Sequence, residues 1–339
     1  MPERAIKLAV IGLGMASKPH LAALKQLAPG VEVAGIYARS PERREEVSDS
    51  WGWPAFKSIE DIAASDADAA ILITPPNARA EIVEELAKAG KAILMEKPVE
   101  RDLQRATQLV ELCEAADVPL GIVLQHRFRA GAEALRDLIS SGRAGRLHVV
   151  RVALPWWRDQ SYYDQPGRGT YDTDGGGVLL TQAIHLLDLM LSLTGPVSEV
   201  AALTGTTALH QMEAEDFATA GLRFANGAIG SLVATTAAYP GDAETLMLDC
   251  EHGSLRLTAG ELVIHWRDGR TETVGEVTGT GGGSDPMDFP CDWHRDLIAD
   301  FADALREDRA PRVTGRDALV AHRLIDAIER SAKSGSRLI

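Results

Sequence analysis

The chain has 339 residues, of which 45% are hydrophobic and 25% charged, a composition typical of globular proteins. A chain of this length exceeds the usual single-domain core, so we expect two domains. Its formal net charge of -14 at pH 7 argues against a nucleic-acid partner. No apolar run reaches the roughly 20 residues of a membrane-spanning helix, so a membrane partner is not expected either.

The start of the chain and its cysteines indicate the compartment. The first expected strand begins at residue 6, which leaves no room for a secretory signal and predicts a cytoplasmic protein. Cys113, Cys250 and Cys291 are widely spaced and follow no metal-ligand pattern. We therefore expect reduced thiols, and no metal site.

The first third of the chain alternates apolar strands with helical patterns. The expected strands are residues 6–11, 31–37, 69–74, 92–95 and 120–124. This alternation predicts a parallel, doubly wound α/β sheet. The first strand runs into Gly-Leu-Gly-Met-Ala-Ser at 12–17 and then a helix, the order that binds a dinucleotide pyrophosphate. Ser17 stands where a third Gly or Ala is usual, so an ordinary strand-to-helix turn is the alternative.

Beyond residue 125 the pattern changes to longer alternating runs. These runs are residues 146–155, 197–206, 216–225, 228–237, 244–250 and 262–267. Asn226-Gly227 and Asp268-Gly269 are hairpin signals, so this half is expected to form an open, mainly antiparallel sheet. Two helices, at 293–307 and 315–333, should end the chain, after a Gly, Ser and Pro-rich loop at 279–290 that is mobile or covers a site.

The end of the second strand bears on the nicotinamide cofactor. It reads Tyr-Ala-Arg-Ser at 37–40, without the Asp or Glu that would hold the ribose of NAD. Arg39 and Ser40, with Arg43 or Arg44 behind them, would instead suit the 2'-phosphate of NADP. In the alternative interpretation, Ser40 caps a helix that begins at Pro41, and both later arginines are solvated. We expect NADP or NAD, with NADP slightly favoured.

A polar stripe marks an otherwise apolar helix at 178–193. Three glycines at 175–177 precede it and would let its start press against another backbone or a ligand. Thr181, His185 and Asp188 share one face, with Gln182 beside it. A buried histidine is often only a hydrogen-bonded core residue, but the stripe and the glycines favour a functional His185, whose ring Asp188 would orient.

Several residues are candidates for substrate contacts. The segment 156–171 is rich in aromatic residues, which predicts a stacking surface, and its arginines would suit a carboxylate or phosphate. An oligomer contact, or loop packing with the arginines paired to nearby aspartates, is the alternative. The end of the fifth strand, where open sheets place ligands, carries Gln-His-Arg at 125–127. Trp293 and His294 are weaker candidates.

Taken together, these motifs identify a known family. The chain resembles the Gfo/Idh/MocA oxidoreductases, which act mostly on sugars, cyclitols and their derivatives, and the match covers nearly the whole chain. The motifs are the glycine turn at 12–17, Thr-Pro-Pro-Asn at 74–77, Glu-Lys-Pro at 96–98, Gly-Gly-Gly at 175–177 with His185 and Asp188, and Ser-Ala-Lys-Ser-Gly at 331–335.

The resemblance implies roles for particular residues. Lys97 and His185 would be the catalytic pair, Glu96 would reach the cofactor ribose, and the loop at 75–77 would line the nicotinamide side. The expected cofactor contacts are Gly12, Gly14, Met15, Ala16, Arg39, Ser40, Arg43, Arg44, Thr74, Pro75, Pro76, Asn77, Glu96, Lys97 and Gln125. The expected substrate contacts are Lys97, Arg127, Trp157, Arg158, Tyr163, Arg168, Thr181, Gln182 and His185.

The resemblance also implies the domain organisation. Residues 1–124 would form a Rossmann-type dinucleotide-binding domain, and residues 125–339 an α+β domain for substrate binding and oligomerisation. Homodimers or homotetramers would form through the open face of the antiparallel sheet, where alternating apolar residues need cover.

The chain departs from the family pattern at two positions. Thr181 stands where many members carry an aspartate, four residues before the histidine, so a second carboxylate cannot share the proton transfer. Thr or Asn occurs there in members that resemble the nucleotide-sugar branch, which shifts this task to His185. Arg79 stands where a histidine often follows the Thr-Pro-Pro-Asn stretch; we expect no effect on the chemistry, because a helix begins there.

The leading hypothesis is an NAD(P)-dependent dehydrogenase or reductase of a secondary hydroxyl or keto group in a sugar, sugar acid or cyclitol. His185 would act as the base, while Lys97 stabilises the developing alkoxide or takes the proton itself. One alternative is a glycosidase-like lyase that uses bound NAD transiently. Another is a non-catalytic nucleotide-binding sensor, which would have no chemical need for both residues.

Overall fold

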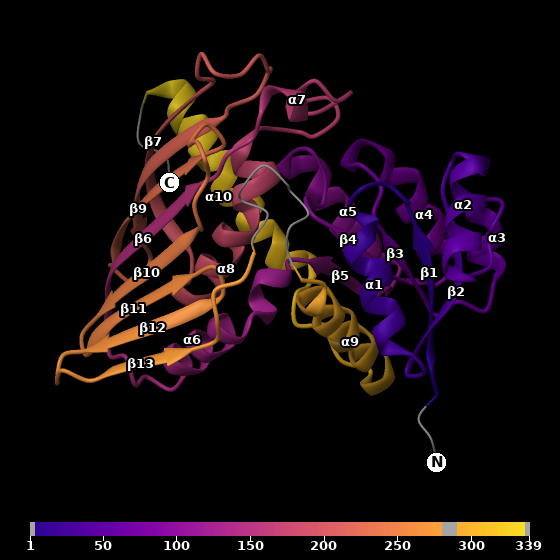
Figure 1. Ribbon diagram of the computed structural model, residues 1–339, viewed down its shortest axis with the longest axis horizontal. Helices are drawn as coiled ribbons and strands as arrows, with labels where there is room; N and C mark the ends of the chain where they lie inside the picture. Colours follow the sequence, from indigo (N-terminus) through magenta and orange to yellow (C-terminus); the bar gives the residue numbers. More distant parts are fainter. Residues whose placement is uncertain (1–3, 280–289, 336–339) are drawn as a thin grey trace. The chain divides into compact units, whose positions relative to one another are not determined.

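The computed structural model describes residues 4–279 and 290–335 (Figure 1). The chain divides into two compact units, Met1–Leu124 with Cys291–Leu319, and Gln125–Pro290 with Val320–Ile339. The first break coincides with the boundary expected after residue 124. The chain then returns, however, so that residues 291–319 belong to the first unit, which local sequence patterns did not indicate.

The first unit contains the predicted parallel sheet. Its strands run in the order β2-β1-β3-β4-β5. Their bounds are β1 (Ile6–Ile11), β2 (Val31–Tyr37), β3 (Ala69–Leu72), β4 (Ala92–Glu96) and β5 (Leu120–Val123). The chain leaves β1 towards β2 and then returns to β3 on the other side of β1. This reversal is the topological switch point at which open parallel sheets bind ligands.

Helices cover the parallel sheet on both faces, as its apolar strands require. They are α1 (Ser17–Leu27), α2 (Pro41–Trp51), α3 (Ile59–Ala64), α4 (Ala80–Lys88), α5 (Leu103–Ala115) and α9 (Asp292–Glu307). α1 packs on α9, while α4 packs between α3 and α5. Every residue of β3, β4 and β5 is buried, which explains why these strands are continuous apolar runs without alternation.

The second unit contains the predicted open sheet, in the order β13-β12-β11-β10-β6-β9-β8-β7. The strands are β6 (Leu147–Pro155), β7 (Val197–Gly205), β8 (Phe217–Phe224), β9 (Ile229–Thr235), β10 (Thr245–Cys250), β11 (Gly253–Thr258), β12 (Glu261–Trp266) and β13 (Thr271–Val274). All neighbours are antiparallel except β6 and β9. The sequence did not predict β11, which follows β10 after a two-residue turn, or the short polar β13.

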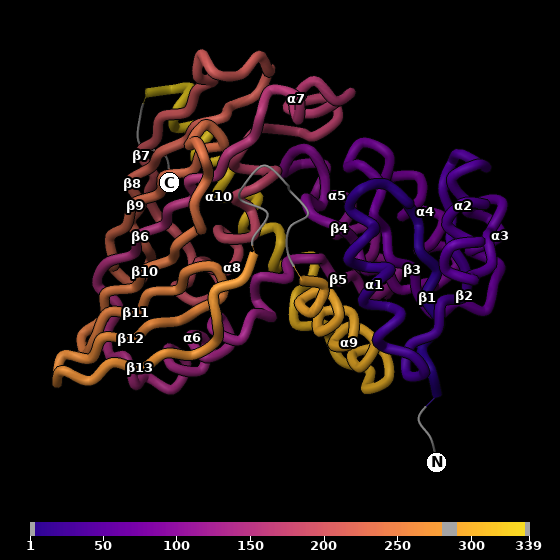
Figure 2. Tube along the Cα trace, viewed as in Figure 1, coloured from indigo at the N-terminus to yellow at the C-terminus, as the bar shows by residue number. Residues whose placement is uncertain are grey.

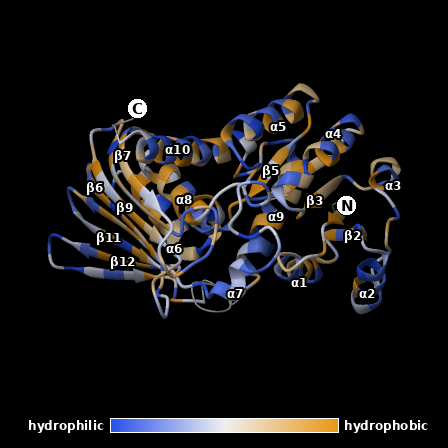
Figure 3. Ribbon diagram, turned by 90° about the horizontal axis from the view of Figure 1, so that it is seen from above, coloured by the Kyte–Doolittle hydropathy of each residue, from blue (hydrophilic) through white to orange (hydrophobic). Residues whose placement is uncertain are grey.

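Helices lie on one face of this sheet, as Figures 1 and 2 show. They are α6 (Ala130–Ser140), α8 (Ile184–Thr194) and the second-unit part of α10 (Gly315–Ser334). Hydrophilic and hydrophobic residues are interleaved along the strands (Figure 3). In β6, for example, Val150, Val152 and Leu154 are buried, while Val149 and Arg151 are exposed. The alternation of apolar and polar residues along each strand therefore shows which face of the sheet the helices cover.

Shorter helical segments complete the fold: η1 (Pro76–Ala78), η2 (Gln125–Phe128), α7 (Gln160–Tyr163) and η3 (Leu179–Ala183). Most of the loop expected at 279–290 lies outside the described residues. No helix in the described ranges is both long and apolar enough to cross a membrane.

Candidate active site

The glycine turn follows β1 directly. Gly12 has a φ of +99°, and a Cβ there would lie 2.9 Å from the backbone of Ile73 and Thr74, so a side chain is excluded. A Cβ at Gly14 would meet nothing within 4 Å, which leaves space for a close phosphate approach. Ser17 begins α1 and donates from Oγ to the Gly14 carbonyl, 2.7 Å away. The serine at the third position thus stabilises the turn.

The stretch after β2 forms a helix cap. The Oγ of Ser40 accepts the Arg43 N–H at 3.1 Å, and Pro41 is the first residue of α2, so the expected cap is confirmed. The expectation that both later arginines are solvated is wrong, because Arg43 and Arg44 are half-buried and donate to main-chain carbonyls. Arg43 Nε also donates to the Leu13 carbonyl at 2.9 Å. Arg44 donates to two main-chain carbonyls, and its guanidinium lies over the Tyr37 ring. Arg39 is exposed, whereas Arg43 and Arg44 are half-buried.

Arg79 links the loops that follow β3 and β4. Its Nε and Nη2 donate to the Thr74 carbonyl at 2.9 and 2.7 Å. Its Nη1 donates to the Glu96 carbonyl at 2.5 Å and to the Pro98 carbonyl. The side chain is fully buried. The residue does stand where α4 begins, as expected, but the sequence did not reveal its contacts with the Glu-Lys-Pro turn.

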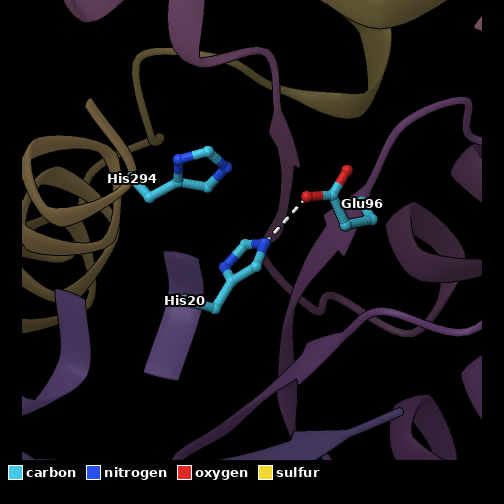
Figure 4. Close-up of side chains that lie close together, drawn as sticks. All are labelled: His20, Glu96 and His294. Carbon is cyan, nitrogen blue, oxygen red and sulfur yellow. Dashed lines mark hydrogen bonds and ion pairs between the residues drawn. The ribbon is translucent and has the colours of Figure 1, made fainter. Parts of the chain in front are cut away.

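Glu96 lies in a buried cluster with two histidines (Figure 4). His20 Nε2 and Glu96 Oε1 are 2.7 Å apart, and the other carboxylate oxygen accepts the Lys97 N–H at 3.1 Å. The His294 ring meets the His20 ring edge-on, with centroids 4.8 Å apart. Sequence patterns gave no signal for His20, because its partner lies 76 residues away.

The cluster has unusual ionisation. Burial raises the pKa of Glu96, but the hydrogen bond with His20 and the neighbouring positive charges outweigh it, so the net pKa lies below the ordinary value. Burial, followed by the charge of His20, lowers the pKa of His294 to about 3. Near neutral pH, Glu96 is therefore an anion and His294 is neutral.

His20, Glu96 and His294 also form the one group in the described ranges whose ligand atoms are close enough to hold a metal, within 4.8 Å of one another. Two ligands of a tetrahedral zinc ion, with bonds of about 2.0–2.1 Å, lie roughly 3.3 Å apart. The 2.7 Å separation of His20 and Glu96 is shorter and fits a shared proton. We therefore interpret His20 and Glu96 as a hydrogen-bonded pair against which the His294 ring packs.

In the second unit, the three glycines allow a close approach of two backbones. A Cβ on Gly177 would lie 1.8 Å from the Glu215 carbonyl oxygen. The Glu215 carboxylate accepts the N–H groups of Gly177 and Leu179 at 3.2 and 3.0 Å and so caps the helix start. The close approach was predicted from the sequence, whereas its partner was not. The first turn, Leu179–Ala183, is a π-helix that leads into α8.

His185 is buried on α8 and stacks on His126, with ring centroids 4.8 Å apart. Both carboxylate oxygens of Asp188 accept from Arg127, at 2.7 and 2.6 Å. The expected substrate contact Arg127 is therefore fixed beside the stripe by an ion pair. Thr181 donates to the Gly177 carbonyl at 2.6 Å and also bonds Gln182, so these two residues of the expected polar face are linked.

The ring of His126 has a defined proton position. Arg129 Nη2 lies 2.6 Å from His126 Nε2, and Arg129 also pairs with the buried carboxylate of Glu244 at 2.5 Å. Because a guanidinium only donates, Nε2 must accept, which leaves the proton of a neutral ring on Nδ1. The ring that covers His185 is thus held by a buried charge pair.

The aromatic segment is largely packed. Arg158 is buried, and its guanidinium lies over the rings of Trp156 and Tyr162. Tyr163 is also buried and bonds Thr236 through its hydroxyl at 2.6 Å. Arg168 pairs with Asp174 at 3.5 Å, as the loop-packing interpretation predicts. Trp157 and Arg168 keep part of their surface, so they are the better placed of these residues to contact a ligand.

Comparison with known proteins agrees with this geometry. Residues 6–123 match the oxidoreductase family model with an NAD-binding Rossmann fold, and residues 132–256 match the Gfo/Idh/MocA C-terminal domain. Inositol 2-dehydrogenase of Rhizobium meliloti (strain 1021) is 27% identical, over 96% of each chain. The 1,5-anhydro-D-fructose reductase of Ensifer adhaerens is 28% identical, over 91% of each.

A solved structure is similar over its whole length. The WlbA dehydrogenase from Bordetella pertussis, in complex with NADH and UDP-GlcNAcA, is 32% identical, with a TM-score of 0.84 over 99% of this chain and 98% of that one. Both units thus have the fold of this dehydrogenase. From the two matched domains and this similarity we conclude that the chain belongs to the Gfo/Idh/MocA family of NAD(P)-dependent oxidoreductases.

Proposed function

We propose that the protein transfers hydride between a nicotinamide cofactor and a secondary hydroxyl or keto group of a sugar, sugar acid or cyclitol, with Lys97 and His185 as its acid-base residues. The observation that carries this proposal is the position of Lys97. It directly follows β4, next to a Glu96 carboxylate that a buried hydrogen bond holds in place. Polar groups at the carboxyl ends of parallel strands are those that open sheets present to ligands.

The residues present fit a dinucleotide. The turn after β1 excludes side chains at Gly12 and leaves space at Gly14. Two buried polar atoms, Thr74 Oγ1 and Gln125 Oε1, have no hydrogen-bond partner among the described residues, and both belong to segments expected to contact the cofactor. A buried acceptor or hydroxyl without a partner is costly, which favours a bound group that supplies one. The nicotinamide would accept or supply the hydride.

Residues of the protein take up or donate the proton that accompanies hydride transfer. During oxidation the substrate hydroxyl loses a proton, and during reduction it gains one. Imidazole is the side chain whose ordinary pKa lies nearest neutral pH, so it can both take up and release a proton, which suits His185 for this step. A Lys97 ammonium would stabilise the developing alkoxide or exchange the proton itself.

The relatives guide the choice of substrate. Inositol 2-dehydrogenase and WlbA, whose structure contains UDP-GlcNAcA, represent cyclitols and nucleotide-linked sugar acids. Thr181, in place of an aspartate, favours the nucleotide-sugar branch. The side chain of Arg168 is partly exposed beside its ion pair with Asp174, and its guanidinium would suit a substrate carboxylate. These features rank nucleotide sugars and sugar acids ahead of free neutral sugars.

The cofactor preference depends on fewer residues than the sequence suggested. Ser40 caps α2, and Arg43 and Arg44 donate to main-chain carbonyls. Any preference for NADP would then depend chiefly on Arg39. NADP stays slightly favoured, because no acidic side chain ends β2 to hold the 2'-hydroxyl of NAD.

The test is reduced-nicotinamide absorbance with purified protein, NAD or NADP, and a panel of free sugars, sugar acids, inositols and nucleotide sugars. Lys97→Met should lower kcat at least roughly 100-fold and leave cofactor binding within threefold, because it removes only the ammonium. Lys88→Met, at an exposed lysine on α4, is the matched control and should keep full activity.

Two outcomes would contradict the proposal. Retained turnover in Lys97→Met would show that another group carries the proton transfer. If the wild type bound cofactor but gave no change in absorbance with any substrate of the panel, the lyase that uses bound NAD transiently or the non-catalytic sensor would be favoured. Glycosides would then be tested next. The named relatives are dehydrogenases and a reductase, which favours net turnover.

A further inference from the structure

The main chain of the Glu-Lys-Pro turn is hydrogen-bonded to Arg79, a residue outside the expected site. Within the described ranges, the hydrogen bonds of Arg79 go to main-chain carbonyls, those of Thr74, Glu96, Pro98 and Val99. One buried guanidinium thereby connects the loop after β3 to the residues on both sides of Lys97. A packed apolar side chain could fill the same space but could not hold these carbonyls.

The charge of Arg79 is retained although it is buried. Burial lowers its pKa to about 10, and the carboxylates of Glu96 and Glu100 oppose this effect. Arg79 is thus a cation near neutral pH. Burying a cation with only carbonyl partners is costly, and three donor atoms of its fork are used on two different loops.

Two sets of hydrogen bonds restrict the main chain at Lys97, one from Arg79 and one through Glu96. Arg79 holds the carbonyl before it and the carbonyl after it. His20 holds the Glu96 carboxylate, which in turn accepts the Lys97 N–H. Because the Lys97 side chain is only partly buried, the direction in which it leaves the turn depends on this main chain.

We propose that Arg79 is a positioning residue for Lys97, one that fixes the main chain on both sides of the lysine and ties it to the loop after β3. This inference rests on the proposed function for its kinetic consequence, but not for its structural one. It also gives a role to the position at which the chain departs from the family histidine. An imidazole has at most two N–H donors and a lysine ammonium lacks the planar fork, so neither reproduces all the contacts.

The kinetic test compares Arg79→Lys and Arg79→Ala with Val83→Ala. Val83 is a fully buried residue on the same helix and serves as the control for lost packing. We expect both Arg79 variants to lose at least tenfold in kcat, with KM for the substrate and Kd for the cofactor within threefold. Val83→Ala should lower Tm but keep kcat within twofold. Guanidinium ion at millimolar concentration should partly restore Arg79→Ala only.

A second measurement does not depend on turnover. The chain has eight lysines, which reductive methylation with ¹³C-formaldehyde converts to separate NMR signals, and Lys97→Met identifies that of Lys97. The Lys97 signal should shift in Arg79→Lys and stay in place in Val83→Ala. Because Arg79→Lys adds a ninth lysine, the Lys97 signal in that variant is identified by adding Lys97→Met to it. If the wild type lacks turnover, the proposed function fails while this signal still decides the positioning role.

The inference is overturned if the Lys97 signal is unchanged in Arg79→Lys, or if the Arg79 variants keep kcat as Val83→Ala does. Arg79→Lys retains the charge and most of the side-chain volume, so it tests the inference even if Arg79→Ala does not fold. A loss of kcat equal in all three variants would also contradict it, because the effect would then reflect stability alone.

Discussion

At the scale of single residues, the ionisation of this protein depends on partners distant in the sequence. Glu96 is an anion although it is buried, because of its hydrogen bond with His20, and His294 is neutral because burial, followed by the charge of His20, lowers its pKa. The sequence marked Glu96 through its motif and His294 only weakly. Their protonation states follow from desolvation and hydrogen bonding, which no local pattern encodes.

His294 makes stability dependent on acidity. Its pKa falls from 6.5 to about 3 on folding, so between these pH values the unfolded state binds a proton at this ring and the folded state does not. The contribution of His294 to the free energy of unfolding is therefore complete above pH 6.5 and is lost progressively as the pH falls towards 3. Between pH 7 and pH 5, the wild type should lose about 2 kcal/mol more unfolding free energy than His294→Gln.

Urea unfolding at a series of pH values measures this difference. His148→Gln, at an exposed histidine on β6, is the control and should keep the wild-type slope. Parallel pH profiles for the wild type and His294→Gln would contradict the prediction, because they would show that His294 is protonated in the folded protein.

At the scale of elements, glycines before two helices let another stretch of main chain pack closely against the helix start. The glycine turn before α1 and the three glycines before η3 both look like ligand loops in the sequence. The structure distinguishes them: a Cβ on Gly14 meets nothing within 4 Å, whereas one on Gly177 would overlap Glu215. The second glycine motif therefore serves the packing of the helix that carries His185.

Gly177→Ala tests this assignment. The added methyl would lie 1.8 Å from the Glu215 carbonyl oxygen, so the backbone must separate and the Glu215 cap on two N–H groups is lost. We expect a loss of at least about 3 kcal/mol in unfolding free energy, or no folded protein. Gly205→Ala, where nothing lies within 4 Å, should change stability by no more than about 0.5 kcal/mol.

Thermal and urea unfolding of both variants give the comparison. A Gly177→Ala protein as stable as Gly205→Ala would mean that the backbone of residues 213–216 can move away without cost. The glycines would then be available for contact with a ligand, as the sequence also allowed.

At the scale of the whole molecule, the open sheet has one face covered by helices, and no helix of the part of the chain that the structure describes lies on its other face (Figure 1). The uncovered face carries exposed apolar side chains along one row of paired positions. Leu203 pairs with Thr219, Thr219 with Val233, and Val233 with Ala153, which forms a row across four strands. Leu203 is 60% and Val233 43% exposed, and Ile229 on the same strand is 55% exposed.

Such a face predicts association of the chain with itself. Replacing both Ile229 and Val233 with Glu should lower the oligomeric state measured by light scattering, because four carboxylates cannot be buried where two copies of this face meet. Leu209→Glu, at an exposed apolar residue in a loop, is the control and should leave the mass unchanged. A monomeric wild type, or a double variant of unchanged mass, would contradict the prediction.

The sequence by itself determined the classes of structure and the motifs that carry the chemistry. Alternation of strands and helices predicted the parallel sheet, and the period of two predicted the open one, because backbone geometry fixes both periods. The strand end before Lys97, the helix of His185 and the Ser40 cap were also predicted, since each depends on neighbouring residues. The return of residues 291–319 to the first unit was not, because no local rule records it.

Only the tertiary structure decided the partners. His20 reaches Glu96 across 76 residues, Arg79 reaches the Pro98 carbonyl across 19, and Glu215 caps a helix start 38 residues before it. Each contact joins segments that the chain path, and not the sequence spacing, brings together. Hydrogen bonds act over a few ångströms, so the residues that support a motif become visible only when the fold has placed them.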